Sequence, residues 1–220
     1  RPRHVRMDLE AFSTIQKPTA DSVDQLFGRI HRAKRPVLLL GTGVSRSKDG
    51  ANVTRFAKSA GIPVVSTMAC TGIFPNNDPL YLGCVGVAGH PSAHDYLNDE
   101  VDLIVAVGTG LDIMARGALS KAMMRAPIAV VNCEPDQIER TLQPSVVVSG
   151  DAGHVFGELN QRLRLRPFYV GRPAGYVLTQ YTTPLQNPED QKQVNDGKIL
   201  LQSEALNLLQ TKLILQSKNP

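Results

Sequence analysis

The sequence predicts an α/β fold: a doubly wound, mainly parallel sheet with helices on both faces. Two observations lead to this prediction. Short apolar runs such as PVLLL (36–40) and DLIVAV (102–107) lack polar alternation and are typical of strands buried on both faces. Segments with helical periodicity separate these runs, and strands that alternate with helices of this length pair in parallel through right-handed crossovers.

The helices follow from the spacing of apolar residues and from residues that favour helix ends. Residues 21–33 place their apolar side chains on one helical face, with Thr19 or Asp21 as N-cap. The segment ANVTRFAKSAG ends at Gly61, a residue type common after a helix C-terminus. Further helices are predicted at about 91–98, 117–125, 135–140 and 152–163, and strands at 36–40, 62–66, 102–107, 128–132 and 146–149.

Residues 62–90 form the most informative stretch. They read IPVVSTMACTGIFPNNDPLYLGCVGVAGH: a strand, a turn of small residues, a loop at Phe74 and Pro75, and a glycine-marked bend. Glycine gives up side-chain packing and chain entropy, so it suggests positive φ angles or close approach of another surface. Turn chemistry alone is the alternative. These expectations concern Gly72, Gly83, Gly86 and Gly89.

Composition excludes several classes of protein. The 220 residues carry a net charge of +4 that is spread along the chain, without Trp, so no nucleic-acid surface is visible. No apolar run approaches the roughly 20 residues that cross a bilayer, which predicts no membrane partner and a cytoplasmic protein. Cys70, Cys84 and Cys133 are too few for a zinc motif or disulfide framework and are expected to be buried thiols. His90 and His94 have i, i+4 spacing, but nothing is patterned to complete a metal site.

The chain divides into four parts that differ in composition and periodicity. An alternating strand-like segment over 1–19 begins with Arg, not Met, and suggests entry from a preceding domain. The α/β domain is predicted over 20–165. A proline-rich linker or extended excursion follows over 166–198, and a leucine-rich helix is predicted over 199–220.

Glycine and polar residues follow the predicted strands. The carboxyl ends of parallel strands meet at one edge of a sheet, and ligands bind there where the chain direction reverses. We therefore predict a binding site at this edge. Its candidates are Gly41, Thr42 and Gly43 after the first strand, Thr67 after the second, Gly108, Thr109, Gly110 and Asp112 after the third, Asn132 after the fourth, and Gly150 and Asp151 after the fifth.

A conventional dinucleotide site does not fit the first of these turns. Arg46 replaces the third glycine of the fingerprint, and Ser66 and Thr67 stand where an acidic residue is needed. The structural alternative for Gly41 to Gly43 is a tight turn that lets the sheet meet the helix over 48–60. Backbone amides at a helix start can still bind an anion.

Three ordered blocks carry a resemblance to a known family. The runs IPVVSTMACTGIFPNNDPLYLGCVG, DLIVAVGTGLD and VVNCEPDQI resemble the Rossmann-like central domain of thiamine-diphosphate-dependent enzymes of the acetolactate synthase and pyruvate oxidase type. The resemblance implies three α/β domains, with thiamine diphosphate and Mg between the first and third. We expect this chain to lack the first and third domains. No segment matches the activating glutamate of the first domain, and Gly150 and Asp151 are followed by Ala152 and not by the glycine of the third domain's diphosphate motif. Alone, it should have no thiamine-dependent turnover.

In FAD-binding members of this family the strand edge holds the flavin nucleotide. The resemblance matches Thr67 with Met68, the bend at Gly86 and Gly89, Gly108 with Asp112, and Gly150 with Asp151. Two family arginines fall instead on Gly110 and Met114, with Arg116 nearby, and the acidic ribose contact falls on Asn132, with Glu134 two residues on. FAD or ADP are thus candidate ligands of this domain, and an empty domain is the alternative.

Three functions remain open at this point. The first is a central domain of a 2-oxo acid decarboxylase or acetolactate synthase-like enzyme, with a structural and nucleotide-binding role within a homo-oligomer and with the first and third domains as partners. The second is a stand-alone nucleotide-binding or electron-transfer module. The third is an NAD-consuming deacylase, for which the zinc cysteines are missing.

Overall fold

The structure is a computed structural model that describes residues 17–171 apart from 87–88, 100, 112 and 135–141. Its centre is a six-stranded sheet of order β3-β2-β1-β4-β5-β6, in which every neighbouring pair is parallel. The predicted doubly wound α/β fold is confirmed. The strands are β1 Pro36–Leu40, β2 Val64–Thr67, β3 Tyr81–Val85, β4 Leu103–Val107, β5 Ile128–Asn132 and β6 Val146–Ser149.

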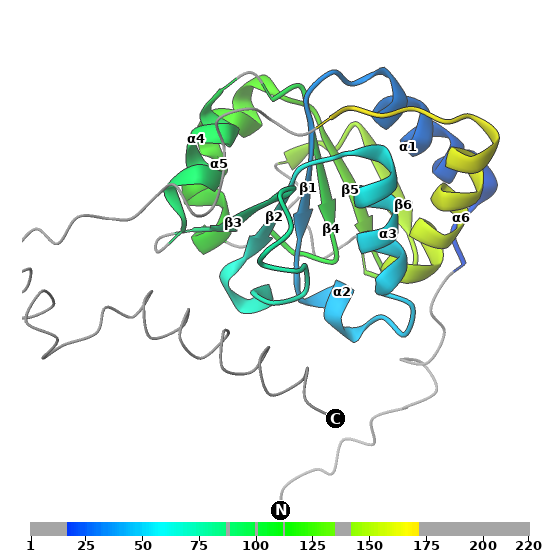
Figure 1. Cartoon of the computed structure of the whole chain (residues 1–220), viewed down its shortest axis with the longest axis horizontal. Helices are drawn as coiled ribbons and strands as arrows, with labels where there is room; N and C mark the ends of the chain where they lie inside the picture. The colour runs from blue at the N-terminus through cyan, green and yellow to red at the C-terminus, as the bar shows by residue number, and fades with distance from the viewer. Residues whose placement is uncertain (1–16, 87–88, 100, 112, 135–141, 172–220) are drawn as a thin grey trace, which may run out of the picture. The chain divides into compact units, whose positions relative to one another are not determined.

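Helices cover both faces of the sheet (Figure 1). One face carries α1 Ala20–Arg32, α3 Ala51–Ala60 and α6 Ala152–Leu165, and the other carries α4 Pro91–Asn98 and α5 Ile113–Arg125. Alternate residues of β1 explain the two layers: Leu38 and Leu40 belong to the first core cluster, and Val37 and Leu39 belong to the second. The apolar runs are thus continuous because both faces of the sheet are covered.

Capping residues define the start of α1 and the end of α3, as the sequence predicts. Thr19 is the N-cap of α1, where its hydroxyl accepts a hydrogen bond from the Ser22 amide at 3.3 Å. Gly61 follows α3 with φ +63°, the left-handed conformation that a helix C-terminus favours. A short helix, α2 Thr42–Arg46, was not predicted, because five residues are too few to show a period.

The prediction of five strands is wrong, because β3 lies where a glycine bend was expected. Gly83 sits inside this strand with φ +104°. Between the pairs Val64 with Tyr81 and Ser66 with Cys84, β3 contains one residue more than β2, so the strand carries a bulge. The expectation of positive φ is confirmed for Gly72, Gly83 and Gly86. Glycine marked the irregularity correctly, but the irregularity lies within a strand.

The first residues of the predicted linker pack onto the domain. The Phe168 ring lies 5.8 Å from that of Phe27 and 5.3 Å from that of His31, between ring centroids. The Val170 amide donates to the Ala60 carbonyl at 2.8 Å. The other residues of this linker, the segment before residue 17, and the predicted helices over 135–140 and 199–220 fall outside the described residues. The domain boundaries stay predictions.

Candidate functional site

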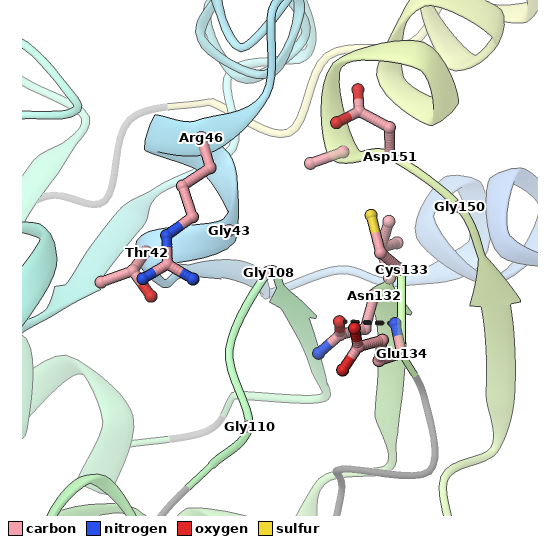
Figure 2. A pocket seen from close by; sticks show the side chains of 12 residues that line it. Thr42, Gly43, Arg46, Gly108, Gly110, Asn132, Cys133, Glu134, Gly150 and Asp151 are labelled. Atoms are coloured by element: carbon pink, nitrogen blue, oxygen red, sulfur yellow. Dashed lines mark hydrogen bonds between the residues drawn. The ribbon is translucent and has the colours of Figure 1, made fainter. Parts of the chain in front are cut away.

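A pocket of about 280 Å³ opens at the carboxyl ends of β1, β4, β5 and β6 (Figure 2). It lies over the position where the strand order reverses, between β1 and β4. Four segments contribute its walls: α2, the loop after β4, the residues after β5, and the start of α6. Open α/β sheets bind ligands at this place.

The structure brings together half of the predicted site residues. Thr42, Gly43, Gly108, Gly110, Asn132, Gly150 and Asp151 line the pocket. Gly41 and Thr109 pack against each other beside it. Thr67, Met68, Gly86 and Gly89 follow β2 and β3 and do not line it, and Asp112 falls outside the described residues.

The glycines after β1 and β4 allow two loops to touch backbone to backbone. A Cβ atom on Gly43 would lie 2.7 Å from the Cα of Gly108, and one on Gly41 would lie 2.5 Å from the Gly108 carbonyl oxygen. The Gly43 amide donates to that oxygen at 2.8 Å, and Gly108 has φ +60°. The structural alternative in the sequence analysis was that these glycines let the sheet meet the helix over 48–60. Their contact is instead the loop after β4.

The same hydrogen bonds limit what the β1 turn can offer a ligand. The amides of Gly41, Gly43 and Val44 donate to Val107, Gly108 and Gly41, respectively. A phosphate cradle needs such amides to point at the ligand. We conclude that this turn shapes the pocket wall and offers few free amides to a ligand.

The first backbone amides of α6 also have hydrogen-bond partners within the protein. Asp151 caps the helix: one carboxylate oxygen accepts from the His154 amide at 3.1 Å and from the Ser47 hydroxyl at 2.6 Å. The Gly153 amide donates to that hydroxyl at 3.0 Å. Side chains of the protein therefore satisfy two of the first amides of α6, and the loop between α2 and α3 is fixed to this wall.

Polar side chains face each other across the remaining space. Arg46 extends from α2 on one side, and Glu134 lies beyond β5 on the other (Figure 2). Asn132 is held in place, because its amide donates to the Thr109 carbonyl at 3.2 Å and its oxygen accepts from the Glu134 amide at 3.1 Å. With one arginine and two carboxylates, the pocket offers acceptors for hydroxyl groups and one cation for an anion.

Cys133 corrects the expectation that all three cysteines are buried. Cys70 is buried, but Cys133 is exposed in the pocket wall. Partial burial, and then the carboxylates of Asp151 and Glu134, raise the pKa of this thiol. The group is a neutral thiol at neutral pH, which does not suit a nucleophile.

Five residues that line the pocket were not among the predicted site residues: Arg46, Val131, Cys133, Glu134 and Ala152. Arg46 counted only as a departure from the dinucleotide fingerprint, because its position over the pocket depends on α2. Cys133 follows Asn132 directly at the end of β5, so its distance from that strand end was the available signal.

The histidine pair has a structural role at its first member. His90 is the N-cap of α4, where its Nδ1 accepts from the Ser92 amide at 3.3 Å. Burial, and then the neighbouring His94, lower the pKa of His90. Within the described part of the chain, no three His, Cys, Asp or Glu side chains gather as metal ligands would.

Comparison with known proteins identifies a family for most of the described domain. Residues 23–159 match the family described as thiamine pyrophosphate enzyme, central domain. The chain is 32% identical over 154 residues to the acetolactate synthase large subunit of Corynebacterium glutamicum, covering 70% of this chain and 24% of that protein. It is 34% identical over 146 residues to a probable chloroplastic acetolactate synthase 2 of Oryza sativa subsp. japonica, covering 66% and 22%.

Fold and pocket define a doubly wound α/β domain with a ligand-sized cavity at its switch point. The chain belongs to the thiamine pyrophosphate enzyme family, as its central domain. An acetolactate synthase of Mycobacterium avium, 30% identical over 159 residues, is matched over 72% of this chain and 25% of its own length. The chain spans about a quarter of the length of these curated relatives.

Proposed function

We propose that this chain is the central domain of an acetolactate synthase-like enzyme that decarboxylates a 2-oxo acid or transfers its two-carbon fragment. The match over residues 23–159 to the central-domain family carries this proposal. The relatives that are named acetolactate synthase support the choice within the family.

The domain's role in such an enzyme is structural. Thiamine diphosphate and Mg would lie between a first and a third domain of a homo-oligomer. The pocket does not fit thiamine diphosphate with its Mg, because no three His, Cys, Asp or Glu side chains of the described residues gather as metal ligands, and Gly150 and Asp151 are followed by Ala152 and not by the glycine of the diphosphate motif. We expect no thiamine-dependent turnover from this chain alone.

The pocket also binds a nucleotide in our proposal, either ADP or the adenosine end of FAD. Glu134 would accept hydrogen bonds from ribose hydroxyls, and the Arg46 guanidinium would hold a phosphate oxygen. A volume of about 280 Å³ lies just below the usual range of ligand sites, which is roughly 300 to 1,000 Å³. It suits an adenosine with its first phosphates better than a complete dinucleotide.

Calorimetric titration of the 220-residue chain with ADP, FAD and NAD tests this proposal. We expect ADP and FAD to bind in the micromolar range. Glu134→Gln and Arg46→Gln should each weaken binding by on the order of tenfold, the usual effect of losing a charged hydrogen bond. Lys121→Gln, on α5 and away from the pocket, is the control.

If none of the three ligands binds, the nucleotide proposal is wrong and the domain has a purely structural role. An equal response of the three variants would place binding outside the pocket. Gly108 is unsuitable as a test position, because any side chain there would disturb the contact with Gly43.

A further inference from the structure

A second cavity lies at the end of α6 that is remote from the nucleotide pocket. It measures about 530 Å³ and runs between α3 and the last turn of α6. We name it the α3–α6 groove. Arg55 of α3, Asn160, Leu163 and Arg164 of α6, and Pro167 and Phe168 line it.

Arginine is the only charged residue type that lines the groove. Arg55 donates to the Asn52 side-chain oxygen at 3.1 Å, and Arg164 donates to the Asn160 carbonyl at 3.4 Å. Both acceptors are neutral. Arg162, two residues before Arg164, has two carboxylate partners, Asp24 and Glu158. Among the described residues, neither Arg55 nor Arg164 has an ion pair of this kind.

Positive charge continues on the other side of α3. A more open groove of about 620 Å³ is lined by Lys48, Arg55 and Lys58, again without a carboxylate among its lining residues. Lys58 pairs with Asp78 at 2.7 Å, just outside this lining. Cationic side chains therefore line the grooves on both sides of α3. The nucleotide pocket, in contrast, combines an arginine with carboxylates.

Apolar side chains lie beside the two guanidinium groups. Leu163 is buried, and Pro167 and Phe168 form the adjoining wall. Guanidinium groups bind carboxylates in a two-pronged geometry, and an apolar wall favours a side chain such as Leu or Phe. Phe168 already contacts the rings of Phe27 and His31, so it is a poor stacking platform for a nucleic-acid base. Two arginines beside an apolar wall favour a polypeptide ligand over a nucleic acid.

We propose that the α3–α6 groove docks an acidic polypeptide segment that carries an apolar side chain. Carboxylates of the segment pair with Arg55 and Arg164, and its apolar side chain packs on Leu163 and Phe168. The inference goes beyond the nucleotide site and does not depend on it.

The test uses the 220-residue chain and a fluorescent peptide with a Leu-Phe pair flanked by glutamates. Fluorescence anisotropy gives the affinity, and hydrogen exchange locates the contact. We expect saturable binding that protects α3 and α6. Arg55→Glu and Arg164→Glu should each weaken it by on the order of tenfold or more. Lys121→Glu makes the same charge change on the opposite face of the sheet and should leave the affinity unchanged.

Three further probes separate this docking mode from its competitors. A peptide with glutamines in place of glutamates, and one with serines in place of Leu-Phe, should both bind more weakly. A short single-stranded RNA should not compete. Equal losses in Lys121→Glu and Arg164→Glu, unchanged affinity of the serine peptide, tighter binding of the RNA, or absence of peptide binding would each overturn the proposal. Melting temperatures of all variants exclude loss of fold.

Discussion

Gly43 and Gly108 show that glycines in a pocket wall can be required by the contact between two turns. Each fills the space that a Cβ on the other would need, and Gly108 also has a positive φ. The sequence placed both glycines at strand ends correctly. It could not reveal their partner, because the contact joins turns that are about 65 residues apart in the chain.

Replacing Gly108 with Ala should therefore destabilise the domain. The left-handed backbone and the clash with Gly43 together should lower the free energy of unfolding by about 2–4 kcal/mol. Gly117→Ala in α5 is the matched control, because its Cβ would meet open space, and helix propensity should raise stability by about 0.5–1 kcal/mol. Urea denaturation of both variants gives the comparison. Equal stabilities would contradict the close packing of the two loops.

His90 should make stability depend on pH. Its pKa in the folded protein lies below the ordinary value of 6.5, mainly through burial. The unfolded chain therefore takes up the proton at higher pH. The stability that neutral His90 provides is complete above about pH 6.5 and declines as the pH falls through this value toward the lowered pKa.

His90→Asn keeps a residue suited to the N-cap of α4 and removes the titration. Melting temperatures measured between about pH 7.5 and pH 5 should fall less steeply for this variant than for the native chain. Parallel curves would show that His90 does not carry the dependence.

Secondary structure was predictable wherever one apolar period lasted through an element. The two layers of helices and the buried strands β1, β4 and β5 follow directly from the sequence pattern. The strand β3 did not, because Gly83 interrupts its apolar run, and α2 is too short for any period. The candidate site was predictable only to the level of strand ends: which ends share a pocket depends on the strand order.

The segment after α6 is an element that has packing but no regular secondary structure. Phe168→Ala should lower the free energy of unfolding by about 1–2 kcal/mol, because its ring is half-buried against Phe27 and His31. Leu165→Ala, at a position that is 87% exposed, should change it by less than about 0.5 kcal/mol. Thermal unfolding of the two variants measures the difference. A silent Phe168→Ala would mean that the segment does not belong to the cooperative unit.

At the scale of the molecule, the described helices cover the two faces of the sheet. None of them is both long and apolar enough to span a bilayer. The face with α3 and α6 carries the proposed docking groove, and the strand ends carry the pocket for which we propose a nucleotide. The two sites lie at opposite ends of α6, so a variant at one can be tested without altering the other.

The bulge in β3 has a further consequence. Among the described strands β3 is at one edge of the sheet, where backbone groups without a neighbouring strand can serve as a template for another chain, although the Leu82 and Cys84 carbonyls already accept from the Ser92 hydroxyl and the His90 amide. A positive φ at Gly83 and the extra residue twist the strand out of the flat geometry that such pairing needs. We expect the glycine that makes β3 hard to predict from the sequence also to hinder pairing of this edge with another chain.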